Sequence, residues 1–400
     1  MKKFTIFQLL AISMFFVCIF SFCIGYALCE SKSGNIIWDK TFGGSENDVA
    51  FSIIQTKDGG CAISSYTRSK GKGKTDAWVI KFDEQGNMEW DKTFGRSEND
   101  VAFSIIQTKD GGYAISGYTI FKNIGEADLY IIKLDEKGNR VWDKIFFESH
   151  WDSAHSLIQT EDEGYVISGY TWSKGSGKQD AWVIKLNNKG DMVWNKTFGG
   201  YDDDMVNSII QTKNGDYVAV GWTMSKGSGK QDAWVIKLDE QGNIKWDKTF
   251  GGTNYDSARS IIQTEDEGYV ISGYTWSKGA GKADGWIIKL DEQGNMEWDR
   301  TIGGSNGDDI LSIIQAKDGD YIAVGETKSK GAGDWDGWII KLDKQGNIQW
   351  DKTIGGSYCD SILSITQTKD GNCVAAGWTM SKGAGGADVW VIKLDENGNL

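Results

Sequence analysis

The chain has few cysteines, and their spacing fits neither a metal site nor a disulfide framework. Three of the six lie in or beside the N-terminal apolar segment, whereas Cys61 and Cys373 occupy the same position of two different repeats. Cys359 stands alone in an expected loop. We therefore expect the cysteines of the repeats to be small buried apolar side chains.

The chain also lacks an excess of positive charge. It holds 43 lysines and arginines against 56 aspartates and glutamates, a formal net charge of −13 at pH 7. Nucleic-acid binding needs clustered positive charge, but the lysines here alternate with acidic residues. This composition excludes nucleic acid as the expected partner and indicates a solvated surface of mixed charge.

The N-terminal segment differs from the rest of the chain. Lys2 and Lys3 precede an apolar run over residues 4–28, which is the layout of a secretory signal. The run is also long enough to span a bilayer uncleaved, since a span needs roughly 20 apolar residues. We expect residues 1–29 to be a signal peptide or N-terminal membrane anchor and residues 30–34 a short linker. The predicted location is secreted or cell-surface.

No sustained helical period follows, but one tryptophan recurs every 52 residues. It stands at Trp38, Trp90, Trp142, Trp194, Trp246, Trp298 and Trp350. Seven copies of one unit therefore occupy the predicted domain of residues 35–400, and such an internal repeat determines the architecture.

Each unit contains four short runs rich in β-branched and aromatic residues, separated by turn signals. In the first unit they are residues 49–56, 61–67, 77–82 and 88–94. Four strands at this period predict an all-β fold, a seven-bladed β-propeller with four antiparallel strands per blade. Ankyrin and tetratricopeptide repeats need helices, and leucine-rich units are shorter.

The two ends of the repeat region predict how the ring closes. Residues 35–42 read as a fourth-type strand with no blade before it, and the last unit ends in a third-type strand. We expect 35–42 to join the last blade, because closure removes open sheet edges.

The recurring LDExGNxxW, as in KLDEQGNMEW and KLDEQGNIKW, resembles the tryptophan-docking motif of quinoprotein-like propeller repeats. Similar repeats occur in exported bacterial and archaeal proteins. The resemblance implies that the seven recurring tryptophans pack blade against blade. Catalytic members of that family have eight blades and a vicinal cysteine pair, which this chain lacks, so no quinone cofactor is expected.

The stretch KGSGK at 174–178 looks like part of a phosphate-binding loop. Such a loop requires a strand before it, a helix after it, and Ser or Thr after the Lys. Gln179 follows here, a strand is expected after Asp180, and the motif recurs with drift in nearly every unit. We interpret it as the connection between the second and third strands.

The antiparallel order places the SKGxGK loops and the GGSEND links on one face, where long variable loops favour binding. One link breaks the repeat as KIFFESHWDSAHS and carries both histidines of the chain. Loop tryptophans recur on the same face. The candidate ligand-binding residues are His150, Trp151, His155, Trp172, Trp276 and Trp335.

An aspartate precedes the first and the third strand of every unit, as Asp48 and Asp76 do. These carboxylates would cap loops by accepting backbone N–H bonds, or ring the channel mouth and bind a cation such as Ca²⁺. The weak metal candidates lie in the exceptional stretches YDDDM at 201–205 and NGDD at 306–309: Asp202, Asp203, Asp204, Asp308 and Asp309.

No catalytic constellation is recognised, so we do not expect an enzyme. The favoured hypothesis is an exported binding or scaffold module that recognises a glycan or a protein through the face with the SKGxGK and GGSEND loops. One alternative is a structural surface protein without a small ligand. The other is a polysaccharide lyase or hydrolase with its site near His150 and His155, where a general base or partial metal site would lie.

Overall fold

The computed structural model describes residues 37–121, 126–146 and 150–395. The expected signal or anchor (1–29) and linker (30–34) lie outside the described residues. In the part of the chain that is described, no helix has the length and apolar character needed to cross a membrane.

The described residues contain 28 strands. In chain order they are β1 (Trp38–Phe42), β2 (Asp48–Gln55), β3 (Cys61–Thr67), β4 (Asp76–Phe82), β5 (Met88–Phe94), β6 (Asp100–Gln107), β7 (Tyr113–Ile120), β8 (Ala127–Leu134), β9 (Arg140–Phe146), β10 (Asp152–Gln159), β11 (Tyr165–Thr171), β12 (Asp180–Leu186), β13 (Met192–Phe198), β14 (Asp204–Gln211), β15 (Tyr217–Thr223), β16 (Asp232–Leu238), β17 (Ile244–Phe250), β18 (Asp256–Gln263), β19 (Tyr269–Thr275), β20 (Asp284–Leu290), β21 (Met296–Ile302), β22 (Asp308–Gln315), β23 (Tyr321–Thr327), β24 (Asp336–Leu342), β25 (Ile348–Ile354), β26 (Asp360–Gln367), β27 (Cys373–Thr379) and β28 (Asp388–Leu394).

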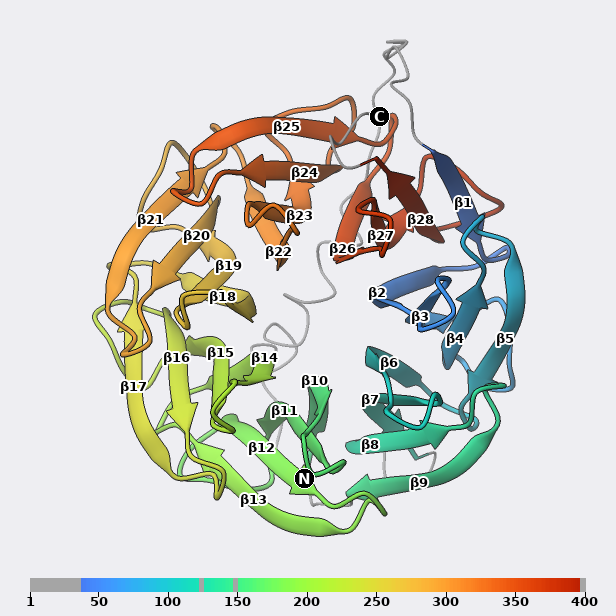
Figure 1. Cartoon of the computed structure of the whole chain (residues 1–400), viewed down its shortest axis with the longest axis horizontal. Helices are drawn as coiled ribbons and strands as arrows, with labels where there is room; N and C mark the ends of the chain where they lie inside the picture. Colours follow the sequence, from blue (N-terminus) through green and yellow to red (C-terminus); the bar gives the residue numbers. More distant parts are fainter. Residues whose placement is uncertain (1–36, 122–125, 147–149, 396–400) are drawn as a thin grey trace, which may run out of the picture. The chain divides into compact units, whose positions relative to one another are not determined.

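These strands form seven four-stranded antiparallel sheets arranged as a ring (Figure 1). The first blade is β2–β5, and each later blade takes the next four strands, up to β22–β25 in the sixth. The seventh blade combines β26–β28 with β1, in a register that pairs Trp38 with Lys393 and Phe42 with Val389. The predicted seven-bladed propeller and its closure by the N-terminal strand are both confirmed.

The hydrophobic core is divided into layers between adjacent blades. In one layer, Ala50, Ile53 and Trp78 of the first blade pack against Val374 and Val391 of the seventh. The third strand of each blade is buried on both faces, because a neighbouring blade covers each side. Apolar runs such as DAWVIKL therefore replace the alternating pattern of a half-exposed strand.

Two classes of tryptophan connect the blades. The third-strand class is fully buried: Trp234 is 1% exposed, and its Nε1 donates to Asp247 Oδ2 at 3.1 Å. The fourth-strand class is half-buried: Trp194 donates from Nε1 to the Glu240 carbonyl of the next blade at 3.2 Å. Gly242 has φ +77°, and a Cβ there would lie 3.0 Å from the Trp194 ring. Glycine at this position thus allows both the positive φ of the turn and the close approach of the indole.

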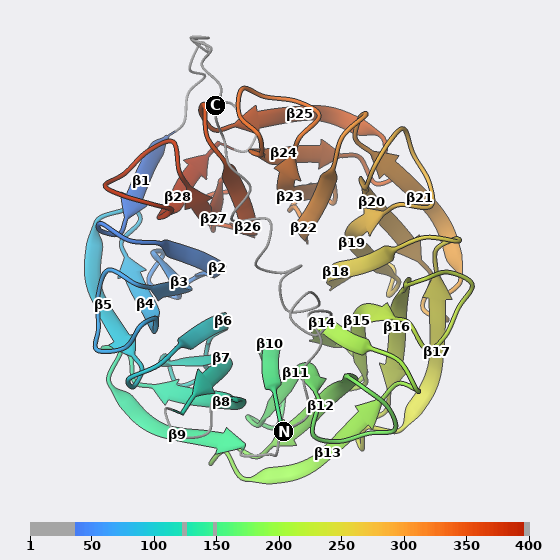
Figure 2. The same cartoon turned by 180° about the vertical axis from the view of Figure 1, so that it is seen from behind.

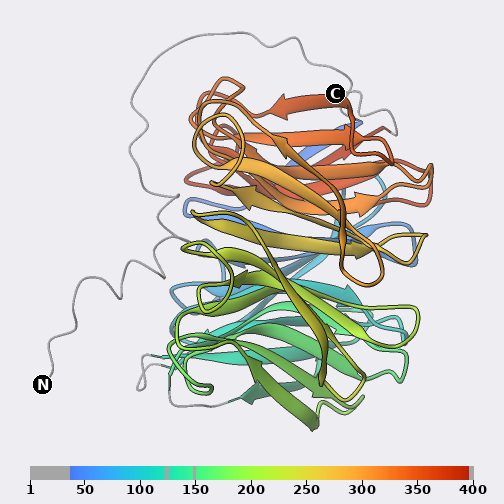
Figure 3. The same cartoon turned by 90° about the vertical axis from the view of Figure 1, so that its left-hand side faces the viewer.

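The strand directions give the ring two different faces (Figure 3). The links that precede each first strand and the loops between second and third strands lie together; we call this the loop face. In the first blade its segments are residues 43–47 and 68–75. The turns at 56–60 and 83–87, with their equivalents in the other blades, form the turn face. The KGSGK stretch lies in the loop between β11 and β12, as predicted.

Candidate binding face and inner ring

One structural position on the loop face carries large side chains in most blades. It directly follows the final threonine of the second strand, where the chain leaves the sheet. Its occupants from the first to the seventh blade are Arg68, Ile120, Trp172, Met224, Trp276, Lys328 and Met380. The third to fifth blades therefore present an arc of tryptophan and methionine along this face.

The exposed aromatic side chains of the described residues all lie on the loop face. Tyr201 is 81% exposed, Tyr358 53% and Trp276 46%. The exposed aliphatic side chains occur elsewhere: most, such as Met192 and Met296, lie at the start of fourth strands beside the turn face. The two faces therefore differ in chemistry as well as in loop length.

The backbone holds the loop-face aromatics in pairs. The Trp172 N–H donates to the Trp151 carbonyl at 3.0 Å, and the Trp276 N–H donates to the Tyr255 carbonyl at 2.9 Å. Trp335 is half-buried, and Lys328 Nζ lies 4.7 Å from its ring centroid. Of the four predicted tryptophans, only Trp276 is exposed; Trp151, Trp172 and Trp335 are each half-buried.

The sequence placed both histidines in one candidate site, but the structure places them in different parts of the propeller. His150 is exposed on the loop face. Its backbone N–H donates to Ser173 Oγ at 2.9 Å, and its Nδ1 lies 3.5 Å from Glu126 Oε1. His155 lies on an inner strand, its ring 4.9 Å from that of Phe103 and 5.5 Å from that of Tyr170. Burial lowers the pKa of His155 to about 3. A general base needs a pKa near the working pH, so His155 does not suit that role.

His155 is one of seven equivalent bulge residues on the innermost strands of the blades, which we call the inner ring. The inner strands β2, β6, β10, β14, β18, β22 and β26 surround the axis in both views (Figures 1 and 2). Each has a β-bulge at the same position, and in β10 the register shifts between Ala154 and Ser156. A bulge redirects a side chain. The bulge residues are Phe51, Phe103, His155, Asn207, Arg259, Leu311 and Leu363.

The inner ring is apolar on one side and polar on the other. The Phe51 and Phe103 rings lie 4.8 Å apart. On the polar side Arg259 donates to Asp309 Oδ2 from Nε at 3.2 Å and from Nη2 at 3.1 Å. Glu326 lies in the same charged group, and burial raises its pKa to about 7. The seven repeated blades thus carry different side chains at their equivalent innermost positions.

The aspartates predicted as weak metal candidates each bind other groups of this chain. Asp202 pairs with Lys178 at 3.1 Å, and Asp203 accepts the Gln179 N–H at 3.1 Å. Asp204 accepts Ser225 Oγ at 2.6 Å, Asp308 accepts Ser329 Oγ at 2.7 Å, and Asp309 binds Arg259. Among the described residues no group of three or more His, Cys, Asp or Glu is placed to hold a metal ion.

Sequence reasoning did not single out Tyr201, Tyr358, Arg259 or Glu326. For Tyr201 and Glu326 the signal was available, because each departs from the residue type that most units carry; the positions of Arg259 and Tyr358 vary from unit to unit. Tyr201 follows GG where most units have Ser, and Glu326 replaces the Tyr or Trp of the other six units.

No family model matches the chain. Among curated proteins, regulatory protein FlaEY of Caulobacter vibrioides is 21% identical over 291 residues, which cover 66% of this chain. The chain spans only 29% of that relative's length.

Solved structures resemble the chain in fold alone. BBS1N in complex with ARL6DN gives a TM-score of 0.52 at 8% identity, covering 90% of this chain and 97% of that one. Sqt1 from Chaetomium thermophilum gives 0.50 at 12% identity, covering 90% and 86%. A puromycin hydrolase S511A mutant gives 0.53 at 12% identity, covering 88% and 52%.

Proposed function

We propose that the protein is a binding or scaffold module that captures a protein partner on its loop face. The observation that carries this proposal is the restriction of exposed aromatic side chains to that face, with Tyr201, Trp276 and Tyr358 on the rim of one rigid ring. Exposed aliphatic side chains are ordinary at a protein surface, whereas tyrosine and tryptophan are enriched at protein interfaces.

The composition of the loop face favours a protein over other ligands. Tyrosine, tryptophan and methionine are enriched at protein interfaces, and tryptophan and tyrosine dominate their binding energy. Met224 and Met380 occupy the same position as Trp276, and both are half-buried. Methionine adapts to irregular apolar surfaces, so this arc suits apolar side chains of a folded partner.

BBS1N, which resembles the chain in fold, was solved in complex with ARL6DN. Loops on a rigid scaffold commonly carry binding residues. The puromycin hydrolase has a comparable TM-score, so fold alone assigns no function. The proposal therefore depends on the loop-face residues themselves.

A matched pair of variants tests this proposal. The triple variant Tyr201→Ser, Trp276→Ser and Tyr358→Ser removes the exposed aromatics, whereas Met88→Ser, Met192→Ser and Met296→Ser removes exposed apolar side chains beside the turn face. Affinity capture with the tagged full chain should retain a specific partner with wild type and the methionine variant and lose it with the aromatic variant. Equal capture by all three proteins would refute the loop-face proposal.

A glycan array run on the same proteins separates the glycan alternative. Sugar rings also stack on exposed aromatic faces, so glycan binding that the aromatic variant loses would replace the protein partner with a carbohydrate. The lyase or hydrolase alternative predicts polysaccharide cleavage that His150→Ala and His155→Ala abolish. A structural role would leave all of these assays negative.

We further propose that the chain is exported to the cell surface or secreted, and that its repeats are of the quinoprotein-like docking type. Lys2, Lys3 and the apolar run 4–28 support export. The contact of Trp194 with Gly242 of the next blade supports the docking type. Fractionation of expressing cells, with N-terminal sequencing of the product, tests export: a full-length cytosolic product would contradict it.

A further inference from the structure

The second blade departs from the other six at a position that is otherwise constant. The third strand carries Trp78, Trp182, Trp234, Trp286, Trp338 or Trp390 in six blades and Tyr130 in the second. In the first blade the Trp78 Nε1 donates to Asp91 at 2.9 Å, and Lys70 Nζ lies 4.5 Å from the ring centroid. Both partners belong to the first blade, and the indole also packs against Val389 and Val391 of the seventh.

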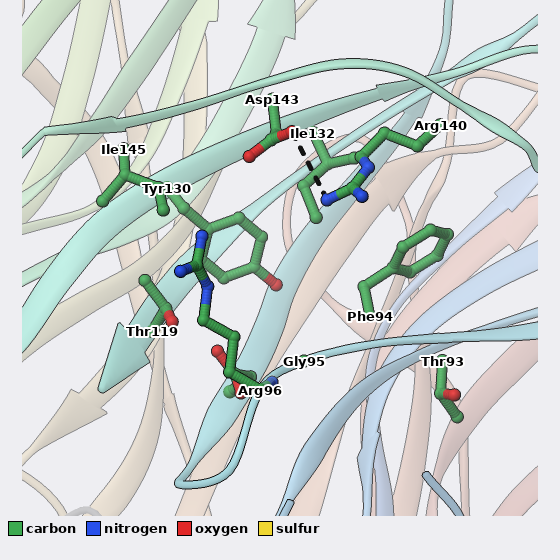
Figure 4. A pocket seen from close by; sticks show the side chains of 11 residues that line it. Thr93, Phe94, Gly95, Arg96, Thr119, Tyr130, Ile132, Arg140, Asp143 and Ile145 are labelled. Carbon is green, nitrogen blue, oxygen red and sulfur yellow. Dashed lines mark hydrogen bonds and ion pairs between the residues drawn. The ribbon is translucent and has the colours of Figure 1, made fainter. Parts of the chain in front are cut away.

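At Tyr130 the equivalent place, between the first and second blades, contains a cavity of about 510 Å³. Phe94 at the end of β5 and Arg96 of the link to the second blade line one side. Tyr130, Ile132 and Ile145 of the second blade line the other (Figure 4). A cavity of this size matches the lower range of small-molecule sites, which combine apolar walls with a few placed polar groups.

Several residues around the cavity are unique to it in the repeat. Arg96 occupies a position that is glycine in five of the other six units. Arg140 replaces methionine, isoleucine or leucine, and Ile145 replaces threonine. Independent drift would scatter such changes around the ring. Their convergence on one cavity, together with Tyr130, points to a shared role.

The Tyr130 hydroxyl is a buried donor without a partner. The side chain is 4% exposed, and its hydroxyl makes no hydrogen bond to any described residue. In Figure 4 this hydroxyl points into the space between Arg96, Phe94 and Arg140. Burial raises the pKa of Tyr130 well above its usual value, so the group keeps its proton. Leaving such a donor unsatisfied costs about 1–3 kcal/mol.

The charges of the cavity wall leave one guanidinium free for a ligand. Arg140 Nη1 lies 3.4 Å from Asp143 Oδ1, and Asp100 Oδ2 accepts the backbone N–H of Arg96 at 2.8 Å. The Arg96 guanidinium stacks 4.6 Å from the Phe121 ring and has no ion pair among the described residues. Arginine binds carboxylates through paired N–H donors.

We propose that this cavity is a binding site for a small aromatic carboxylate. The carboxylate meets the Arg96 guanidinium and accepts the Tyr130 hydroxyl, and the flat ring lies against Phe94, Ile132 and Ile145. A bare inorganic anion would leave the side of the cavity formed by Phe94, Ile132 and Ile145 unfilled. The class is that of indole or benzene rings bearing a short acid, which resembles the indole that fills this place in the other blades.

Calorimetric titration of the full chain with three probes tests the proposal. Indole-3-acetate carries both ring and charge, indole lacks the charge, and acetate lacks the ring. Indole-3-acetate should bind with one site per chain, indole about tenfold more weakly because the charge-assisted hydrogen bonds are lost, and acetate without detectable heat.

Three variants locate the binding. Tyr130→Trp restores the residue of the other six blades, keeps the fold and fills the cavity, so it should abolish indole-3-acetate binding. Arg96→Gln should weaken binding about tenfold or more. Arg300→Gln is the control, because Arg300 binds the carbonyls of Asp299 and Gln345 in another blade, and it should bind like wild type. No binding to wild type, or binding that persists in Tyr130→Trp, would overturn the proposal.

Discussion

Arg259 of the fifth blade and Asp309 of the sixth form an ion pair between the innermost strands of their blades, with Nη2 3.1 Å from Oδ2. The guanidinium also lies 5.1 Å from the Tyr274 ring centroid. Of the other six bulge residues, four are phenylalanine or leucine and the remaining two are His155 and Asn207. A buried pair at one junction of a repeating ring therefore breaks its symmetry at a definite place.

Removing one member of this pair should cost more than removing both. Arg259→Leu, which introduces the residue found at Leu311 and Leu363, leaves Asp309 buried without its cation and should destabilise the fold by about 3 kcal/mol. Chemical denaturation of Arg259→Leu, Asp309→Ser and the double variant measures the coupling. Strictly additive losses in the double variant would show that the pair contributes no interaction energy.

Glu326 should make stability depend on pH. Burial raises its pKa to about 7 from an ordinary value of 4.5. Folding thus favours the protonated carboxyl, and this contribution is complete below pH 4.5 and is lost as the pH rises through 7. Glu326→Gln should melt like wild type at pH 5 and above wild type at pH 8. The same gap in Tm at both pH values would show that Glu326 is not buried in its acid form.

The two tryptophan classes should differ in their cost of removal. Trp234→Ala removes a fully buried indole and its bond to Asp247, and should cost about 3–5 kcal/mol. Trp194→Ala removes a half-buried ring and should cost about 2 kcal/mol. Urea denaturation of the full chain gives both values. Equal costs would mean that the docking contact on Gly242 matters as much as the buried layer.

The loop-face aromatics should contribute little to folding. Because Tyr201, Trp276 and Tyr358 are exposed, replacing each with serine should change the unfolding free energy by about 0.5 kcal/mol or less. Thermal melts of the single variants check this expectation. A large loss of stability at any of them would mean that the side chain supports its own loop, and any loss of binding there would have a structural cause.

The fold could be predicted because the sequence presents the same unit seven times. The predicted runs 61–67 and 88–94 coincide with β3 and β5, and 49–56 differs from β2 by one residue at each end. The predicted first strand, 35–42, contains β1, which spans Trp38–Phe42 and ends at the same residue. Turn glycines and apolar runs repeat at fixed offsets, so each boundary is supported by several copies.

The inner ring and the cavity could not be predicted in the same way. Arg259 stands at a bulge, and alternation along a strand does not reveal which residue a bulge redirects. Tyr130, Arg96 and Ile145 come together from different strands and a link. Their departures from the repeat were visible, but only the structure shows that they meet. The roles of His150, Trp151 and Trp172 stay predictions.

Site-specific photo-crosslinking tests the central claim most directly. A photoreactive phenylalanine is placed at Trp276 or Tyr201 on the loop face and, as matched controls, at Met192 or Met296 beside the turn face of the full chain. The account predicts one discrete crosslinked protein partner from both loop-face positions and none from the controls. Crosslinks from the turn-face positions alone, or from all four positions equally, would contradict a binding function for the loop face.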